Sequence, residues 1–283
     1  MGSRTIAGLL GLVAAALVFS ASAPAATVPD RIVSLSPTAT EDMFAIGAGK
    51  QVVAVDSDSD YPPNAPHTKL SAYTPNAEAI AKYNPDLVVI SNDEDNIVAQ
   101  LGKLHIPVLT EPAATNLAGD YAQLLKLGHV TGHVAGAQQE VAKMKRQVAA
   151  VIASVPKSAK GMTFYLELSP DYYSATSTTF TGQALALLGL HDIADSAKGS
   201  GSGYPKLSAE FIVAADPQLI VLSDTVCCGE TAAKVKARPG WGTIAAVQGN
   251  GVVGVNDDIA SRWGPRIVDF MRIVADRVRA IAK

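Results

Sequence analysis

One pattern occurs twice in this chain, and the repeat constrains the fold more than any other feature of the sequence. Residues 77–91 align without a gap on residues 209–223, and seven of the fifteen positions are identical. Each copy begins with Ala-Glu, passes through a proline and ends in an apolar run followed by serine. This order is typical of a short helix, a turn and a buried strand. We therefore predict two similar lobes with a small-molecule site in the cleft between them.

Short apolar runs alternate with helical patterns along both halves of the chain. Strands are predicted at residues 32–35, 52–55, 87–90 and 106–109, and again at residues 162–168, 218–223 and 252–255. Helices are predicted at residues 41–46, 182–190 and 265–283, the first of them behind a capping box formed by Thr38 and Glu41. Strands that alternate with helices favour parallel sheets covered by helices. The predicted fold class is therefore α/β, with two Rossmann-like lobes.

A long helical pattern separates the two halves. Apolar residues recur at alternating spacings of three and four from Val134 to Val155, and Pro156 ends the pattern. This pattern predicts one helix of 22 residues, about 33 Å long. It is either an ordinary core-packing helix or a rigid strut between two lobes. The predicted domains are an N-terminal lobe at residues 26–132, a connecting helix at residues 133–156 and a C-terminal lobe at residues 157–283.

The N-terminus predicts export. Arg4 precedes an apolar run at residues 6–19, which is followed by two Ala-x-Ala sites. A run of 14 residues is shorter than the roughly 20 that a membrane helix needs, so residues 1–25 are predicted to be a secretory signal peptide, with a retained anchor as the alternative. No cysteine lies near the cleavage region, which argues against a lipid anchor there. The mature protein is therefore expected in the periplasm or elsewhere outside the cytoplasm.

Composition and motifs argue against several classes of function. The net charge of -3, with lysine and arginine scattered along the chain, excludes the basic face that nucleic-acid binding needs. The five histidines show no metal-ligand spacing, and no nucleophile elbow, H-E-x-x-H motif or phosphate loop occurs. We therefore predict a binding protein, with no enzyme activity, no cofactor and no metal site. A secreted enzyme that uses Cys227, Cys228 or an acidic metal site is the competing class.

Several short motifs follow one another over nearly the whole mature chain. They are Arg-Ile-Val-Ser-Leu-Ser-Pro at 31–37 with Thr-Glu at 40–41, Ser-Asp-Tyr-Pro-Pro at 59–63, Asn-Ala-Glu-Ala-Ile at 76–80, Asn-Pro-Asp-Leu-Val at 84–88, Ser-Ala-Glu at 208–210, Arg-Pro-Gly-Trp at 238–241 and Ser-Arg-Trp-Gly-Pro-Arg at 261–266. With these motifs the chain resembles the iron-siderophore and vitamin B12 type of substrate-binding protein of ABC importers. That resemblance implies the class III periplasmic-binding-protein fold, in which one long helix joins two lobes.

The resemblance also implies a function and partners. The protein would capture a ferric siderophore or a cobalamin-type chelate and deliver it, as a monomer, to an ABC permease with its ATPase subunits. A haem or metal-ion binder on the same scaffold is the alternative. Glu78 and Glu210 stand at matching positions of the two repeats, where the family carries the carboxylates that dock on permease arginines. Each is otherwise a glutamate favoured by the start of a helix.

Candidate ligand-binding residues lie in the loops that follow the predicted strands, because ligands bind beyond the carboxyl ends of parallel strands. These residues are Ser36, Tyr61, Asp93, Tyr172, Tyr173, Arg262, Trp263 and Arg266. The aromatic side chains offer flat apolar faces, and the arginines are candidate anion clamps. Tyr61 also follows the pattern of B12-binding relatives. The carboxylates of these loops are either solvated or, if they line the cleft, favour neutral or cationic ligands over anionic catecholates.

The two cysteines, Cys227 and Cys228, are adjacent and cannot join distant segments. In an oxidising compartment they would form a vicinal disulfide that stiffens their loop, or remain an inert pair. Two thiolates that bind a soft metal or a cobalt or haem centre are the alternative, although no histidine lies nearby in the sequence.

Overall fold

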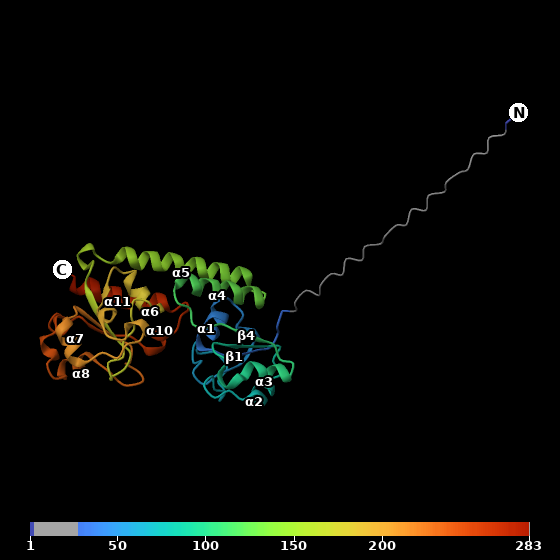
Figure 1. Cartoon of the computed structure of the whole chain (residues 1–283), viewed down its shortest axis with the longest axis horizontal. Coiled ribbons are helices and arrows are strands. Elements are labelled where there is room, and N and C mark those ends of the chain that lie inside the picture. The colour runs from blue at the N-terminus through green and yellow to red at the C-terminus, as the bar shows by residue number, and fades with distance from the viewer. Residues whose placement is uncertain (3–27, 283) are drawn as a thin grey trace.

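A computed structural model of the chain describes residues 1–2 and 28–282, and it shows two α/β lobes (Figure 1). The first lobe contains the parallel strands β1 (Ile32–Leu35), β2 (Val52–Val55), β3 (Leu87–Ile90) and β4 (Val108–Thr110), in the order β2-β1-β3-β4. The second contains β5 (Thr163–Glu167), β6 (His191–Asp192), β7 (Leu219–Leu222) and β8 (Val252–Gly254), in the order β6-β5-β7-β8. The predicted fold class is confirmed. The predicted signal peptide lies outside the described residues, apart from residues 1–2.

The repeat extends to the pairing of the central strands. Ile32 of β1 pairs with Leu87 of β3, and Phe164 of β5 pairs with Leu219 of β7, so that both partners keep the offset of the sequence repeat. The repeated helices are α2 (Ala77–Ala81) and α7 (Ala209–Ala215). Asn76 and Ser208 cap them, each with a side-chain oxygen that accepts a hydrogen bond from a first-turn amide. The two lobes therefore share both the strand order and the register of their central strands.

Further helices cover the two sheets. The first lobe has α1 (Pro37–Ala45), α3 (Ile97–Lys103) and α4 (Leu117–Val130). The second has α6 (Phe180–Ala186), α8 (Ala232–Ala237), α9 (Ala245–Gln248), α10 (Asp257–Ser261) and α11 (Ile267–Ile281). Helix α6 ends before residue 190, where its prediction ended, because Gly189 adopts a left-handed conformation with φ of 81°.

The predicted capping box is wrong. Helix α1 begins at Pro37, so Thr38 lies within its first turn and is not its cap. The cap is Ser36, whose hydroxyl accepts a hydrogen bond from the amide of Ala39 at 3.2 Å. Proline favours the first helical position because it lacks an amide hydrogen and has a suitable φ, and this shifts the helix start towards the strand.

Helix α5 (Val134–Ser154) runs continuously for 21 residues alongside both lobes (Figure 1). It packs on α4 of the first lobe and on α11 of the second. Its buried stripe includes Val141, Met144 and Val148, which join a single hydrophobic core that also contains Ile32 of β1 and Phe270 of α11. Both interpretations of this helix therefore apply, because it packs in the core and also bridges the lobes. The predicted domain boundaries themselves stay predictions.

Within 28–282, none of the helices combines the length and the apolar character that a transmembrane segment requires.

The contact between α5 and α1 provides a test of how closely these helices pack. A Cβ atom at Gly136 of α5 would lie 2.0 Å from the carbonyl oxygen of Ile46, whereas one at Gly102 of α3 would meet nothing within 4 Å. We expect Gly136→Ala to lower the free energy of unfolding by about 1–3 kcal/mol, because the two helices must separate. Gly102→Ala should raise it by up to about 1 kcal/mol. Denaturant unfolding of both variants measures the difference, and equal stability of the two would contradict the packing described.

Candidate functional site

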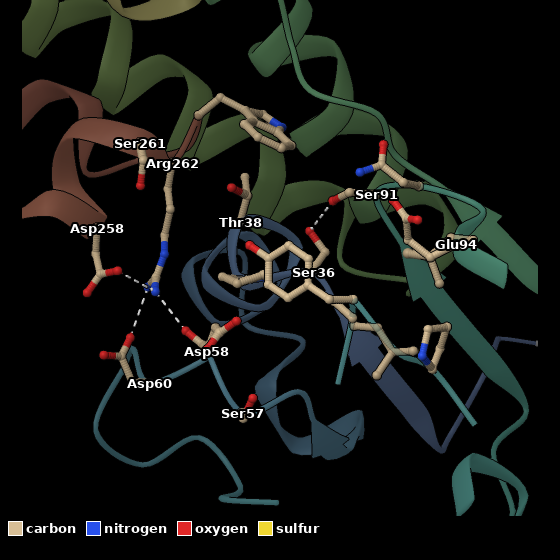
Figure 2. Close-up of a pocket in the computed structure, with 18 of the residues that line it drawn as sticks. Ser36, Thr38, Ser57, Asp58, Asp60, Ser91, Glu94, Asp258, Ser261 and Arg262 are labelled. Carbon is tan, nitrogen blue, oxygen red and sulfur yellow. Dashed lines mark hydrogen bonds and ion pairs between the residues drawn. The ribbon is translucent and has the colours of Figure 1, made fainter. Parts of the chain in front are cut away.

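A cavity of about 540 Å³ lies between the lobes, at the carboxyl ends of β1 and β3 (Figure 2). Ser36 and Ser91 follow these two strands, and the Ser91 hydroxyl lies 2.8 Å from the Ser36 hydroxyl, within hydrogen-bond distance. From the second lobe, α10 and the segment behind it contribute Asp258, Arg262 and Trp263. The cavity thus occupies the place where parallel α/β sheets bind their ligands.

Hydrogen-bond acceptors dominate this cavity. Its lining includes the carboxylates of Asp58, Asp60, Glu94 and Asp258 and the hydroxyls of Ser36, Thr38, Ser57, Ser91 and Ser261. Tyr73, which is 76% exposed, and Trp263 add aromatic surface. Arg262 is the one cation among the described lining residues. The site therefore suits a ligand that donates hydrogen bonds and carries no large negative charge.

Arg262 joins the two lobes through ion pairs. Its guanidinium lies 2.8 Å from Glu41. It also lies 3.0 Å from Asp60 and 2.8 Å from Asp258, and it donates a hydrogen bond of 2.7 Å to the carbonyl of Asp58 (Figure 2). The side chain is buried, and burial by itself would lower the pKa of Arg262. The hydrogen bond that it donates to Glu41 and the charge of Asp258 outweigh that effect and raise the pKa. Arg262 therefore stays charged.

Glu41 is the common partner of two arginines. It is 4% exposed, and its carboxylate also accepts hydrogen bonds from Arg266, at 2.7 Å from Nε and 2.5 Å from Nη2. We call the group of Glu41, Asp60, Asp258, Arg262 and Arg266 the Glu41 cluster. This cluster connects α1 and the loop after β2, in the first lobe, to the segment between α10 and α11, in the second lobe.

The structure brings three of the eight candidate ligand residues into this cavity: Ser36, Arg262 and Trp263. Tyr61 and Arg266 instead line a second cavity of about 500 Å³ beside α5, with the Arg266 guanidinium 4.2 Å from the centre of the Tyr61 ring. Both arginines proposed as anion clamps already have carboxylate partners. Their role in ligand binding stays a prediction.

The other three candidates lie beside the cavity or apart from it. Asp93 does not line it, although its neighbours Asn92 and Glu94 do, and the Asp93 carboxylate accepts a hydrogen bond from the amide of Val98 at 2.9 Å. The ring of Tyr172 stacks on Trp241, with centroids 5.6 Å apart. Tyr173 is exposed. The cavity residues that were not singled out from the sequence are mainly Thr38, Tyr73, Ser91 and Asp258. All of these except Tyr73 lie in loops that follow predicted strands, and that position was their signal.

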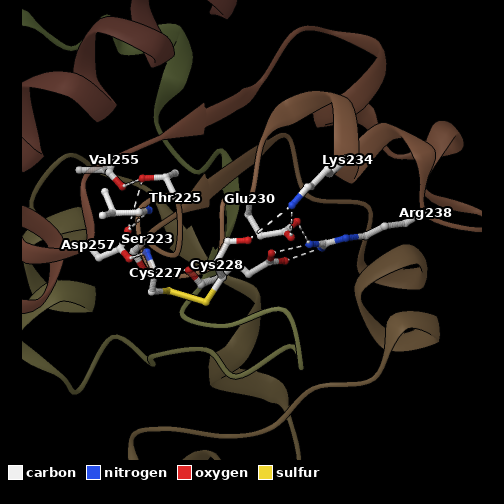
Figure 3. The surroundings of a disulfide bond; sticks show 11 residues. Ser223, Thr225, Cys227, Cys228, Glu230, Lys234, Arg238, Val255 and Asp257 are labelled. Atoms are coloured by element: carbon white, nitrogen blue, oxygen red, sulfur yellow. Dashed lines mark hydrogen bonds and ion pairs between the residues drawn. A yellow bond between two sulfur atoms is a disulfide. The ribbon is translucent and has the colours of Figure 1, made fainter.

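The second lobe carries its own charge cluster at the carboxyl ends of β5 and β7. Arg238 lies 2.8 Å from Glu230 (Figure 3). It also lies 2.6 Å from both oxygens of the buried Glu167, and its guanidinium is 4.5 Å from the centre of the Trp241 ring. Asp224 is fully buried, and neither of its carboxylate oxygens has a hydrogen-bond partner within the described part of the chain. Burial, followed by the charge of Glu167, raises the pKa of Asp224 to about 7.

Two buried carboxyls lie close to the Glu41 cluster. Asp42 of α1 and Asp120 of α4 are both buried, and burial raises the pKa of each, that of Asp120 to about 7. The charges of Asp120 and Glu41 further raise the pKa of Asp42. Neither oxygen of Asp120 has a hydrogen-bond partner among the described residues. Both carboxyls therefore keep their protons to a higher pH than an exposed aspartate does.

Comparison with known proteins agrees with this architecture. The periplasmic binding protein family matches residues 32–259. A cobalamin-binding protein of Halobacterium salinarum is 34% identical over 258 residues, which cover 88% of this chain and 69% of that protein. The match to the family covers well over half of the chain, and the chain belongs to the periplasmic binding protein family.

Solved structures show the same fold. A possible iron-binding periplasmic solute-binding protein of Staphylococcus epidermidis superposes with a TM-score of 0.77 at 27% identity, covering 89% of this chain and 99% of that one. A periplasmic haem-binding protein of Roseiflexus superposes with a TM-score of 0.78 at 21% identity, covering 90% and 99%. Since these proteins are named for different ligands, the shared fold does not determine what this chain carries.

The Glu41 cluster makes a prediction about stability. Glu41→Gln removes the charge between two arginines, and we expect it to lower the free energy of unfolding by about 3 kcal/mol. Asp269→Asn removes one partner of the exposed pair that Asp269 makes with Arg272, and we expect it to cost less than about 1 kcal/mol. Chemical denaturation compares the two variants. A Glu41→Gln protein as stable as the Asp269→Asn control would show that the cluster does not hold the lobes together.

The raised pKa of Asp120 predicts how the stability of the protein depends on pH. Because its pKa in the folded protein lies above the ordinary value, its contribution to stability is complete at low pH and is lost as the pH rises through about 7. The free energy of unfolding of the wild-type protein should therefore fall between pH 5 and pH 8. In Asp120→Asn this fall should be smaller by about 2 kcal/mol. Urea unfolding at several pH values measures this slope. Asp171→Asn, a change at an exposed carboxylate, should leave the slope unchanged, and an unchanged slope in Asp120→Asn would refute the assignment.

Proposed function

We propose that this protein captures a cobalamin-type chelate in the cavity between its lobes and delivers it to an ABC importer outside the cytoplasm. The observation that carries the proposal is the acceptor-rich lining of that cavity, whose described cation, Arg262, is already neutralised by three carboxylates. The amide groups around a corrin ring are hydrogen-bond donors that match carboxylates and hydroxyls. The name of the Halobacterium relative supports the same ligand class.

The same lining disfavours two other cargo classes. A ferric catecholate is strongly anionic, and haem carries two propionates, so each would place negative charge near Asp58, Asp60, Glu94 and Asp258. A neutral or cationic ferric hydroxamate meets no such repulsion and is the second candidate cargo. The similarity to a possible iron-binding protein at 27% identity supports this second candidate.

Capture requires little movement of the lobes. Helix α5 crosses between them without a break, and the Glu41 cluster joins them a second time at the edge of the cavity. A site that is formed before the ligand arrives avoids the entropy cost of ordering it during binding. We infer a cleft that opens and closes through a small angle rather than a wide hinge.

Docking on the permease would use one carboxylate from each lobe. Glu78 and Glu210 are both exposed at the second position of α2 and α7. Ile80 of α2 and Ile212 of α7 are each buried in a hydrophobic cluster of their own lobe. Neither cluster is the core to which α5 contributes. The two carboxylates are thus presented at matching places, as a transporter with two equivalent halves would require.

Ligand titration tests the proposed cargo. The protein should bind cyanocobalamin saturably with one site per chain, and binding should change the fluorescence of Trp263, which lines the cavity. Trp263→Phe should reduce that change, because Trp263 lines the cavity and the other tryptophan, Trp241, does not. Haemin and a ferric catecholate should bind far more weakly. Binding of either anion in preference to cyanocobalamin, or a protein that binds no cobalamin, would contradict the proposal.

Transport in whole cells tests the docking surface. The double variant Glu78→Arg with Glu210→Arg should abolish cobalamin uptake and leave cobalamin affinity unchanged, because both residues lie outside the cavity. A control pair, Gln138→Arg with Gln139→Arg, adds positive charge to exposed positions of α5 and should leave uptake intact. If the glutamate variant lost affinity for cobalamin, or transported it normally, the docking role would be wrong.

A further inference from the structure

The loop that holds the two cysteines matches a cavity loop of the first lobe. We call residues 224–230 the disulfide loop; it follows β7, and Cys227 and Cys228 are bonded to each other in it (Figure 3). When the gap-free alignment of the two repeats is continued past the strands, Val226 corresponds to Glu94 and Cys227 to Asp95. Glu94 lines the cavity. Since β3 and β7 have the same pairing register, the disulfide loop occupies the equivalent position at the carboxyl end of its own strand.

A second contact places the disulfide loop beside the cavity. The carboxylate of Asp257 accepts hydrogen bonds from the amides of Val226 at 2.9 Å and of Cys227 at 2.7 Å. Asp257 begins α10, and its neighbour Asp258 lines the cavity. The disulfide loop therefore borders the part of the second lobe that closes the site.

The two matching loops differ in chemistry. The first lobe presents five exposed polar residues in a row, at positions 92–96. The disulfide loop presents Val226, which is 66% exposed, then the two cysteines and Gly229, all exposed and without a formal charge. Sulfur is polarizable and packs well against flat ring systems. The matching loop of the first lobe is thus polar and acidic, whereas Val226 and the two cysteines make the loop of the second lobe apolar.

The disulfide loop is also held in position at both ends. On one side Thr225 donates a hydrogen bond of 2.8 Å to the carbonyl of Val255, close to the Asp257 contacts (Figure 3). On the other side Lys234 donates to the carbonyl of Cys228 at 3.4 Å, and Glu230 is bound by Arg238. The bond between adjacent cysteines restricts the backbone that lies between these anchors. An exposed apolar surface held in this way is prepared for contact with a ligand.

We propose that Val226 and the Cys227–Cys228 disulfide form an apolar platform on the second wall of the cleft, against which one face of the bound macrocycle packs. This inference rests on the proposed function and adds the orientation of the cargo. The hydrogen-bond donors at its edge meet the carboxylates and hydroxyls of the first lobe, and its apolar face meets the disulfide loop. The platform selects flat ring systems over compact, fully polar chelates.

Affinity measurements on matched variants test the platform. Val226→Asp places a charge on it and should weaken cyanocobalamin binding by roughly tenfold or more, since burial of a valine side chain contributes about that factor. Cys227→Ser with Cys228→Ser removes the disulfide with little change in volume and should also weaken binding. Val28→Asp is the control, because Val28 is similarly exposed at 48% but precedes β1, at the opposite edge of its sheet.

Binding measurements on the wild type and the variants distinguish a wrong platform from a wrong cargo. Equilibrium dialysis with cyanocobalamin gives the affinity of each variant, and circular dichroism checks that each is folded. Weakened binding by Val226→Asp and by the serine pair, with normal binding by Val28→Asp, supports the platform. If the wild-type protein binds cyanocobalamin and both loop variants bind it equally well, the platform is wrong and the proposed function stands. If the wild-type protein binds no cyanocobalamin, the proposed function and the platform are both wrong.

Discussion

The carboxylate of Glu41 is the interaction on which the geometry of the cleft depends. It accepts hydrogen bonds from both Arg262 and Arg266, which lie more than 200 residues further along the chain, and it is itself only 4% exposed. Removing one partner of such a buried group leaves uncompensated charge, so the cluster holds its shape. Helix α1, which carries Glu41, also supplies Pro37 and Thr38 to the floor of the cavity. The same contact thus joins the lobes and positions one wall of the site.

The two lobes repeat one fold, and the two proposed walls of the cleft between them differ in chemistry. The repeat retains the features that the scaffold needs, namely the proline turn, the apolar strand and the closing serine. The loops beyond the strands diverge, with Asn92 and Glu94 in the first lobe and Val226 and the disulfide in the second. Loops can change in this way because they carry little of the core packing. An amphipathic cargo with a polar edge and an apolar face fits between such walls.

Seven of the eight strands and the connecting helix could be predicted from the sequence because their signals are local, whereas β6 has only two residues and was not predicted. The runs at 32–35, 52–55 and 87–90 became β1, β2 and β3 with the same bounds, and the three-four spacing gave α5 within one residue. The Glu41 cluster could not be predicted in this way, since its partners come from opposite ends of the chain and no spacing links them. For the same reason Tyr61 and Arg266 were expected in the ligand cavity and lie in the second one. Which loop residue faces which cavity depends on how the lobes meet.

The central claim is that cargo binds between the two lobes and contacts both walls. Amide hydrogen exchange followed by mass spectrometry, with and without saturating cyanocobalamin, tests it most directly. The account predicts slower exchange in residues 91–96 of the first lobe and in residues 224–230 and 257–263 of the second, with α5 unchanged. Protection in one lobe alone, or protection centred on residues 61–64 and 143–147 around the second cavity, would contradict it.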